Sequence, residues 1–580
     1  MEIRRKKAGK VLFTEPKYRR YKIVSEQDQE VLHTFDFSKD KIFHEDEIEK
    51  NIGSDTFIIT HSPVRKHNHL SGILILANNK TYGKHKDKFI YKCIPDNKYL
   101  PTFLIPYGKK NGFKKHFNNL YVTFKFENWT DLHPRGKLNQ VIGPVTELSA
   151  FYEYQLYCKS LNASIQKFNR ETSQKLKQKT EREFIEQIMQ DYPNIKDETN
   201  NNNIFTIDAA SCCDYDDALE YHSFKPSKRG IAHVIRIHIA NVSLWMDVLN
   251  LWDSFSDRIS TIYLPDRKRP MLPTCLSECL CSLIEGQKRF VFTFEIEVDD
   301  NYDILKTNVY NSLIRVYKNH VYESNTLLND KNFKELLRIA QKMSGRSSTK
   351  MLPHVKSSHD LVTYFMILMN YRVSRKLIES NDGIFRTAFI DKNLALPDDL
   401  DENTKNFITA WSSQAGEYVL CKNKQKHEWL DLDTYCHVTS PIRRLVDLLN
   451  SIIYQNNFSV TKLSDNARLF VDKWKEKLGY VNICMKYIRK VQTECSLLSL
   501  FHEENKSGKY DILKGVLFNR CKRDDDIYIY NVYIAKIKML TKIKLLERVE
   551  NYTKTQFRMF YFKDENTLKQ KIRLQIYNSS

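Results

Sequence analysis

Short apolar runs separated by basic, turn-rich segments occupy two stretches of the chain, one near each end. Between residues 56 and 145, runs such as TFIIT, GILILA and LYVTFKF alternate with pieces such as GKKNGFKK. From about residue 509, the runs DILKGVLFNRC and DIYIYNVYIAKI show the same pattern. Runs of this length, bounded by turn residues, are typical of antiparallel strands that close into small barrels. We therefore expect one barrel of OB type over residues 51–147 and a second over residues 506–580.

The middle of the chain changes to strands followed by helices. Residues 148–192 carry apolar side chains at mixed spacings of three and four, which indicates helices, and the polar segment KDETNNNN, residues 196–203, indicates a linker. Beyond it, strands around NIFTID, HVIRIHIANV and RFVFTFEIEVD precede helices around LVTYFMILMNYRVSRKLIE and RRLVDLLNSIIYQ. We expect a helical connector with its linker over residues 148–203 and a mixed α/β domain over residues 204–505. The predicted fold class is α+β, with this domain flanked by the two barrels.

The charge of the chain favours a polyanionic partner. The 580 residues include 91 Lys and Arg against 71 Asp and Glu, a formal charge of +20 that is spread along the sequence. Nucleic acid is favoured over a membrane, because no apolar run approaches the roughly 18 residues of a transmembrane helix. We expect residues 1–50 to be a basic arm, either solvated or in contact with nucleic acid. The start, MEIRRKKAGK, lacks the apolar core of a signal peptide, so we expect a cytoplasmic protein, and we expect it to be a monomer. The abundance of Lys, Asn and Ile is typical of an AT-rich genome, such as that of a large virus.

Two groups of side chains look like metal ligands but are expected to be structural. Cys275, Cys279 and Cys281 lack the paired spacing and nearby His of a zinc site, and the twelve cysteines of the chain are expected to be reduced thiols. His233 and His238 are five residues apart, and this odd spacing on a strand points them to opposite faces.

Four aspartates, Asp208, Asp214, Asp216 and Asp217, fall within ten residues of this basic chain. Two carboxylates about 4 Å apart repel by roughly 4 kcal/mol at an effective dielectric constant near 20, so converging acids need a cation among them. A calcium loop of the EF-hand type is excluded, because a loop that starts at Asp214 lacks the required Gly and Glu. Acids at the end of a strand and along the following loop supply the oxygen ligands that Mg²⁺ prefers, and Mg²⁺ activates water in phosphoryl chemistry. The alternative is an acidic loop that faces solvent.

The segment YCHVTSPIRRLVDLLN, residues 435–450, indicates a phosphate site. It places Arg443 and Arg444 in the first turn of a predicted helix, where positive side chains are unfavourable unless an anion is present. A phosphodiester is such an anion, since the guanidinium group and the free amides of a helix start can both bind it. The alternative is a surface arginine pair. Acids that hold a metal ion and an arginine that binds phosphate together indicate a metal-dependent nuclease.

These residues resemble the ribonuclease II, or RNB, family of exoribonucleases, which includes the catalytic subunit of the exosome. The family pattern T-x-D-x5-D-x-D-D-A is met by residues 206–218, and H-I-A-D-V-S resembles HIANVS at residues 238–243. The segment YLPDRKRPMLPTCLSECLCSL, residues 263–283, and the segment HVTSPIRRLVDL, residues 437–448, resemble two further family motifs. The motifs occur in the family's order over about 250 residues.

The resemblance implies hydrolysis of single-stranded RNA from its 3′ end to 5′-mononucleotides, with Mg²⁺ as cofactor, as one or two ions that Mn²⁺ can replace. It implies a cold-shock-like barrel before the catalytic domain and an OB barrel after it. By position, it assigns metal binding to Asp208, Asp214 and Asp217, catalysis to Asp216 and Arg443, and RNA contacts to Tyr263, Tyr322 and Arg444.

The sequence departs from the family at two places. Asn241 stands where Asp is usual, and Thr363 and Tyr364 stand where the family commonly has an acidic residue. Two other functions stay open: an RNA-binding or assembly protein on an inactive RNB scaffold, and a nuclease directed at DNA.

Overall fold

The computed structural model describes the chain except for residues 1–4, 15–19, 25–29, 35, 37–38, 52–56, 78, 109–116, 225–229, 347–353, 391–393, 414–415, 508–511, 524–525, 564–569 and 578–580. The chain divides into two compact units. The first unit comprises Met1–Asn162, Leu264–Asp266 and Lys490–Ser580, and the second comprises Ala163–Tyr263 and Arg267–Arg489.

A closed barrel lies in the first unit and confirms the predicted fold of this region. Its sheet has the order β6-β10-β11-β9-β8-β7, and β6 also pairs with β8, so that five strands form a ring and β7 extends β8 as a hairpin. The strands are β6 (Leu70–Leu74), β7 (Lys84–His85), β8 (Lys88–Pro95), β9 (Phe103–Tyr107), β10 (Leu120–Asn128) and β11 (Arg135–Pro144), and the four-residue helix α1 (Pro63–Lys66) precedes them. Helix α2 (Leu148–Cys158) follows the barrel.

The first fifty residues are not the arm expected from their charge. They contain four strands of an antiparallel sheet with the order β3-β2-β1-β4-β5: β1 (Arg5–Phe13), β2 (Arg20–Val24), β3 (Glu30–Thr34), β4 (Glu47–Asn51) and, after them, β5 (Phe57–His61). Val11 and Phe43 of this region are buried in one hydrophobic core with Leu74 and Phe103 of the barrel. The prediction of a basic arm was therefore wrong, because apolar side chains between the charged ones bury against the barrel.

A second antiparallel sheet forms the C-terminal part of the first unit. Its order is β25-β24-β23-β26-β27, from β23 (Ile512–Lys522), β24 (Tyr528–Ile534), β25 (Met539–Leu545), β26 (Lys554–Lys563) and β27 (Gln570–Ile576). Leu517, Tyr530 and Phe557 are buried in its core. The sheet agrees with the OB-like module expected there. It follows the long helix α12 (Leu478–Ser507), within which the division between the two units falls.

The second unit is built around a mixed seven-stranded sheet with the order β12-β19-β18-β15-β14-β13-β20. Its strands are β12 (Lys196–Glu198), β13 (Phe205–Asp208), β14 (Asp217–Ser223), β15 (His233–Ala240), β18 (Lys288–Val298), β19 (Ile304–Arg315) and β20 (Lys318–Val321). The predicted linker at residues 196–203 was partly wrong: β12 pairs in parallel with Ser312–Ile314 of β19 and forms an edge of the sheet. The mixed α/β class and the strands expected around residues 205, 235 and 290 are confirmed.

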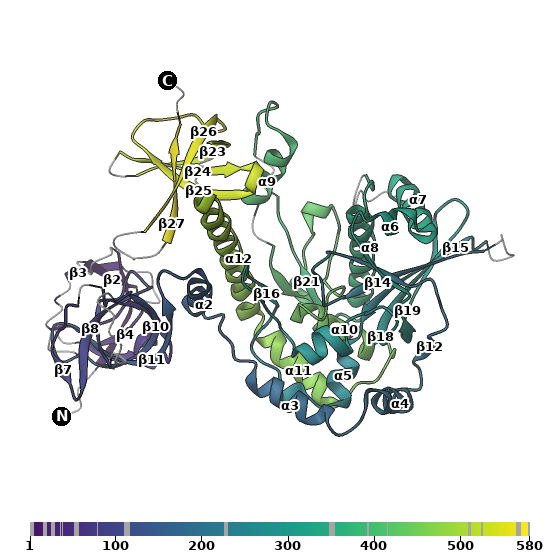
Figure 1. Ribbon diagram of the computed structural model, residues 1–580, viewed down its shortest axis with the longest axis horizontal. Helices are drawn as coiled ribbons and strands as arrows, with labels where there is room; N and C mark the ends of the chain where they lie inside the picture. Colours follow the sequence, from purple (N-terminus) through teal and green to yellow (C-terminus); the bar gives the residue numbers. More distant parts are fainter. Residues whose placement is uncertain are drawn as a thin grey trace. The chain divides into compact units, whose positions relative to one another are not determined.

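Helices surround this sheet, and those within residues 166–191, 358–379 and 445–457 were expected from the sequence. The helices are α3 (Gln166–Leu176), α4 (Glu181–Asp191), α5 (Val242–Val248), α6 (Asn325–Asn329), α7 (Lys331–Arg346), α8 (Ser358–Glu379), α9 (Glu402–Ser412), α10 (Leu445–Asn457) and α11 (Asp465–Glu476). Two small ribbons, β16 (Ile262–Tyr263) with β17 (Lys268–Arg269) and β21 (Ile384–Arg386) with β22 (Tyr418–Leu420), lie between them in sequence. Helices α7 and α8 pack beside one another (Figure 1).

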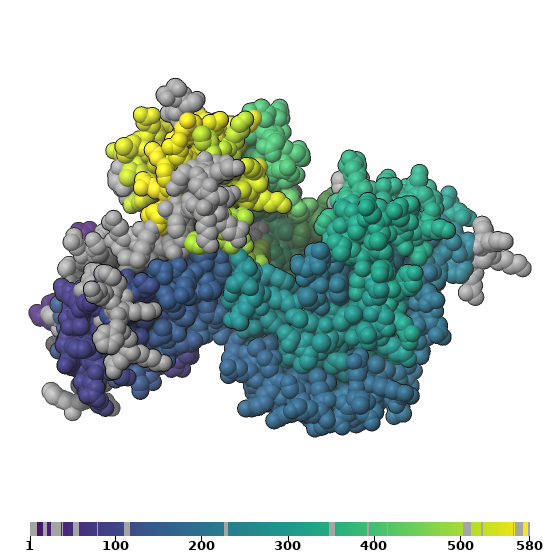
Figure 2. Space-filling view, viewed as in Figure 1, coloured from purple at the N-terminus to yellow at the C-terminus, as the bar shows by residue number. Residues whose placement is uncertain are grey.

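The predicted connector of residues 148–203 does not form a module of its own. Helix α2 belongs to the first unit, whereas α3 and α4 belong to the second. In Figure 2 the blue segment that carries α3 and α4 forms one continuous surface with the teal segments of the second unit. All twelve cysteines are free, and Cys275 and Cys279 lie in a π-helix, Cys275–Leu280. Among the described residues, no helix has the length and apolarity needed to cross a membrane.

Candidate active site

Two neighbouring strands place the first and last of the four aspartates at one edge of the sheet. Asp208 is the last residue of β13 and Asp217 is the first residue of β14, and the two strands pair antiparallel. On the other side of β13, β20 runs parallel to it, and the backbone N–H of Tyr322 donates to the carbonyl of Asp208 at 3.0 Å. The sheet therefore holds Asp208, Asp217 and Tyr322 close together.

The loop between these strands is fixed by hydrogen bonds from outside it. The buried hydroxyl of Ser282 donates to the carbonyl of Cys213 at 2.9 Å and accepts from the backbone N–H of Tyr215 at 3.0 Å. The carbonyl of Asp216 accepts from the N–H of Ala240 on β15 at 2.8 Å. These hydrogen bonds fix the backbone of the loop at residues 213, 215 and 216, and so they fix the positions of the aspartates that the loop carries.

The structure brings all four predicted aspartates together around one cavity of about 500 Å³ in the second unit. Its lining also includes the predicted Arg443 and Tyr263, as well as Lys268, Cys212, Ser211 and Ala209. Residues more than 200 positions apart in sequence therefore meet at one site, as the nuclease prediction required.

Asp216 is bound by Arg443 and by the backbone beside it. The Nε–H of Arg443 donates to Oδ2 of Asp216 at 2.9 Å, and the N–H of Ile442 donates to Oδ1 at 2.9 Å. The carbonyl of Arg443 in turn accepts from the hydroxyl of Ser260 at 2.8 Å. Because Asp216 is only 3% exposed, burial raises its pKa to about 7 even though Arg443 lowers it. Asp216 thus orients the guanidinium at the rim of the cavity, where 43% of the Arg443 side chain stays exposed.

Asp214 is bound by the ribbon of β16 and β17. Tyr263 and Lys268 face each other across this ribbon. The Lys268 ammonium donates to Oδ1 of Asp214 at 2.9 Å and lies 3.0 Å from the carboxylate of Glu278, while the Tyr263 hydroxyl donates to Oδ2 of Asp214 at 3.3 Å. The charge of Asp214 is therefore balanced within the protein.

Asp208 and Asp217 lack a comparable partner. The Oδ2 atom of Asp208 is buried and has no hydrogen-bond donor in the described part of the chain. Burial and then the charge of Asp208 raise the pKa of Asp217 to about 7, and burial, opposed by a hydrogen bond from Thr206, raises the pKa of Asp208 to about 6. These two carboxylates, which we call the open pair, carry negative charge that the protein leaves unbalanced.

The open pair fits a hard divalent cation. An orphaned buried carboxylate oxygen next to a second carboxylate is the donor set that Mg²⁺ or Mn²⁺ takes, with water and phosphate oxygens in the remaining positions. Within the described ranges, however, no three acidic, histidine or cysteine side chains are already arranged around one metal position. The reason lies in the two ion pairs above, since Lys268 and Arg443 hold the carboxylates of Asp214 and Asp216.

The two predicted arginines have different surroundings. Neither lies within the first turn of a helix, because α10 begins at Leu445 with Arg444 as its N-cap residue, so this part of the prediction was wrong. Arg443 lines the cavity, whereas Arg444 donates to Oδ1 of the buried Asp447 at 2.8 Å and is not part of the cavity lining. The contacts of Arg444 in the structure are those of a residue that anchors the start of α10.

Tyr322 borders the open pair, and a histidine that the sequence analysis missed stacks on it. The rings of Tyr322 and His359 lie 3.7 Å apart at an angle of 11°. Burial, followed by the charges of Asp217 and Asp208, raises the pKa of Tyr322. His359 follows the N-cap residue Ser357 of α8, and the capping pattern S-x-x-D from Ser357 to Asp360 was the available signal for this helix start.

The departures at 241 and 363–364 are not part of the lining of the carboxylate cavity. Asn241 caps α5, and its amide donates to Asn311 at 2.9 Å and to Gln455 at 3.3 Å in a buried network that an Asp could not supply in the same way. Thr363 is exposed, and Tyr364 lines a different pocket.

The two histidines of β15 are strand residues, as predicted. The side chain of His238 is buried between Glu220 and Thr293, and the ring of His233 bonds Tyr221.

Comparison with known proteins agrees with this geometry. Residues 196–459 match the RNB domain family, which confirms the resemblance found in the sequence. The chain is similar to ribonuclease R of Thermotoga maritima, with 33% identity over 121 residues, and to the exosome complex exonuclease RRP44 of Mus musculus, with 27% identity over 318 residues. These matches cover 21% and 42% of this chain but only 16% and 33% of the two relatives.

Solved structures share the fold over nearly the whole chain. Mycoplasma genitalium ribonuclease R, solved in complex with ribose methylated single-stranded RNA, superimposes with a TM-score of 0.69 at 15% identity and covers 98% of this chain and 100% of its own. Yeast Ssd1, described as a pseudonuclease, superimposes with a TM-score of 0.62 at 14% identity and covers 92% of this chain and 78% of its own.

Proposed function

We propose that this protein is a divalent-metal-dependent exoribonuclease that hydrolyses single-stranded RNA from the 3′ end to 5′-mononucleotides. The observation that carries the proposal is the cavity in which the open pair, Asp214 and Asp216 meet the exposed part of the Arg443 guanidinium. Similarity to proteins named ribonuclease R and exosome exonuclease supports RNA as the substrate. The solved ribonuclease R complex with single-stranded RNA supports the strandedness.

The roles of the side chains follow from their contacts. Asp208 and Asp217 would hold a Mg²⁺ ion, which supplies an activated water and neutralises charge on the phosphate. Asp216 accepts from Nε of Arg443 at 2.9 Å and the Ser440 hydroxyl accepts from one terminal nitrogen at 3.0 Å, so that the other terminal nitrogen can meet a phosphate oxygen where charge develops. Tyr263, 41% exposed beside Asp214, offers a face on which a base can stack.

The test uses the full chain and an RNA labelled at its 5′ end in one experiment and at its 3′ end in another. With Mg²⁺, we expect the 3′ label to be released at once as a mononucleotide while the 5′-labelled strand shortens stepwise, and we expect EDTA to stop both. Asp216→Asn should abolish hydrolysis and leave RNA binding within a few-fold of wild type. The matched control is Asp472→Asn, an exposed residue of α11, which should hydrolyse RNA at the wild-type rate.

Two other functions make different predictions for the same assay. An RNA-binding protein on an inactive RNB scaffold would bind the strand and release no nucleotide with Mg²⁺ or Mn²⁺, and the internal pairing of Asp214 with Lys268 is the feature that favours this alternative. A DNA-directed nuclease would degrade a DNA strand of the same sequence at least as fast as the RNA. Either result would overturn the proposal.

A further inference from the structure

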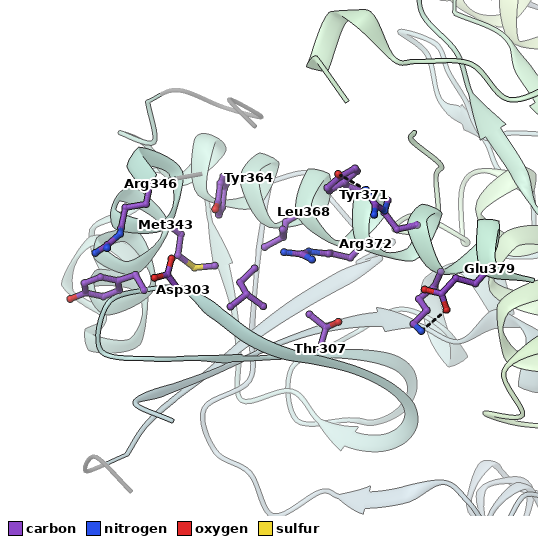
Figure 3. Close-up of a pocket in the computed structure, with 13 residues that line it drawn as sticks. Asp303, Thr307, Met343, Arg346, Tyr364, Leu368, Tyr371, Arg372 and Glu379 are labelled. Atoms are coloured by element: carbon purple, nitrogen blue, oxygen red, sulfur yellow. Dashed lines mark hydrogen bonds and ion pairs between the residues drawn. The ribbon is translucent and has the colours of Figure 1, made fainter. Parts of the chain in front are cut away.

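A second pocket of about 570 Å³ lies in the second unit, away from the carboxylates. It is bounded by the start of β19, the end of α7 and one face of α8, and it shares no lining residue with the catalytic cavity (Figure 3). On β19, Asn311 is paired through β18 and β15 with the position of Asp217, whereas the pocket is lined by Ile304 and Thr307 of the same strand. These two residues are seven and four positions from Asn311, which corresponds to roughly 23 Å and 13 Å along the strand.

The pocket has an excess of positive charge. Four cations line it, Arg346, Arg372, Arg375 and Lys376, against two carboxylates, so the formal excess is +2. Arg375 bonds Asp433 at 3.0 Å and Lys376 bonds Glu379 at 2.7 Å. Among the described residues, no carboxylate pairs with the guanidinium of Arg346 or Arg372. The guanidinium of Arg372 thus lines the pocket without an internal counter-ion among these residues and favours an anionic ligand, because the planar guanidinium matches phosphate oxygens.

The hydroxyl of a buried tyrosine gives an independent indication of a ligand. Tyr364 is only 2% exposed and lines the pocket, yet its hydroxyl makes no hydrogen bond to the part of the chain that the structure describes. Burial raises the pKa of Tyr364 to about 12, against the opposing charge of Arg372, so the hydroxyl remains a proton donor at neutral pH. The hydroxyl is therefore a donor that an acceptor atom of a ligand in the pocket can take without displacing a partner in the described part of the chain.

The remaining lining fits a flat apolar ring. Ile304, Met343 and Leu368 form an apolar surface, and the half-buried Tyr302 and Tyr371 add aromatic area beside it. Figure 3 shows Leu368 and Arg372 on the side of α8 that faces Thr307 of β19, so the apolar and the charged parts lie next to each other. A phosphate alone would leave the apolar part of the pocket unfilled. The volume of the pocket is within the range of about 300–1,000 Å³ found for small-molecule sites.

We propose that this pocket binds a nucleoside monophosphate, with the phosphate held by Arg372, an acceptor atom on the Tyr364 hydroxyl, and the base against Leu368 and Met343. The site acts independently of the catalytic cavity, and its existence does not depend on the proposed hydrolysis. If the protein does release mononucleotides, the ligand belongs to the same chemical class as its product.

Binding is measured by calorimetry on the full chain in EDTA, with AMP and UMP as probes and without RNA. We expect saturable binding of one nucleotide to wild type and to Asp216→Asn. Arg372→Gln should weaken binding about 10- to 100-fold, and Tyr364→Phe, which keeps the ring and removes only the hydroxyl, about 3- to 10-fold. Arg468→Gln, an exposed arginine of α11, is the matched control and should bind as wild type.

Three results would overturn this proposal. The first is nucleotide binding that Arg372→Gln and Tyr364→Phe leave unchanged. The second is inorganic phosphate that competes as strongly as AMP, which would show that no base is recognised. The third is a single-stranded oligonucleotide whose binding depends on Arg372 more strongly than that of AMP, which would make the pocket part of an RNA path. Because no hydrolysis is measured, a failure here and a failure of the nuclease assay are distinguishable.

Discussion

Removal of one charge from the open pair should stabilise the metal-free protein. In the structure the Asp217 carboxylate is partly buried, and the charge of Asp208 acts on it directly. The substitution Asp217→Asn keeps the size and shape of the side chain and removes the negative charge. It also provides an amide that can donate to the orphaned Oδ2 atom of Asp208. We therefore expect a variant that loses activity and gains stability in EDTA.

The magnitude follows from the pKa of Asp217, which burial and Asp208 raise from 3.8 to about 7. Each pKa unit corresponds to about 1.4 kcal/mol, so the ionised carboxylate costs up to about 4 kcal/mol in the folded state at pH values above 7. Solvent at the partly exposed carboxylate lowers this cost of ionisation, and we expect the free energy of unfolding of the variant to be about 2 kcal/mol larger than that of wild type. For a unit of this size, that gain should raise Tm by roughly 2–5 °C.

The assay is thermal unfolding of wild type and Asp217→Asn in EDTA and then in excess Mg²⁺. A ligand at a hundredfold excess over its Kd stabilises the folded state by about 2.7 kcal/mol, so wild type should gain Tm with Mg²⁺ and the variant should gain little. The difference between the two Tm values should therefore become smaller or change sign when Mg²⁺ is added. Asp472→Asn should follow wild type in both buffers. A variant that is less stable than wild type in EDTA, with an unchanged response to Mg²⁺, would refute the reasoning.

Three further predictions concern the neighbours of the open pair and the pH dependence of stability. Lys268→Met should lower Tm in EDTA, because it leaves Asp214 without its cation. It should also enlarge the Tm gain with Mg²⁺, because the Asp214 carboxylate can then reach the metal. An unchanged Tm response to Mg²⁺ would count against this role of Lys268. Arg443→Lys should reduce the rate of RNA hydrolysis about 10²- to 10³-fold while RNA affinity changes only a few-fold, and a loss of affinity alone would contradict the role of the planar guanidinium. Burial and then the charge of Arg386 lower the pKa of His427 from 6.5 to about 4, so its neutral form stabilises the fold. This contribution is complete above pH 6.5 and is lost as the pH falls toward 4. Between pH 6.5 and 4, the Tm of His427→Gln should therefore fall by less than the Tm of wild type. The control His354→Gln, at an exposed position, should show the same fall in Tm as wild type.

The acidic cluster could be predicted from the sequence because its geometry is local. Asp208 and Asp217 end and begin two strands whose apolar patterns are clear, and the short loop between them limits how far the four acids can separate. The β15 and β18 strands were found for the same reason. Their alternation of apolar and polar side chains is visible within each segment.

The errors concern contacts that the local sequence does not contain. Residues 196–198 are polar, and they form a strand only because Ser312–Ile314 of β19 supply hydrogen bonds. Arg443 was expected inside a helix, but it lies in a turn, and its carbonyl is bound by the Ser260 hydroxyl and by the N–H of Thr261. Arg444 after it has an extended backbone, so the helix begins only at Leu445.

Lys268 shows the same limitation at the site itself. Its place opposite Tyr263 on a small ribbon, and its contact with Asp214 more than 50 residues earlier, depend on the fold and leave no signature in composition or spacing. The sequence predicts which acids converge, and the fold decides which of them are balanced by a lysine or an arginine.

The most direct test of the site is to locate a bound Mn²⁺ ion by its anomalous scattering in crystals of the full chain. The account predicts a peak between the carboxylates of Asp208 and Asp217, within about 2.0–2.3 Å of one oxygen of each, on the side of the cavity where Arg443 lies. The peak should be absent from crystals of Asp217→Asn grown and soaked in the same way. A Mn²⁺ ion bound at another position, or none at concentrations that support hydrolysis, would contradict the central claim that the open pair is a divalent metal site.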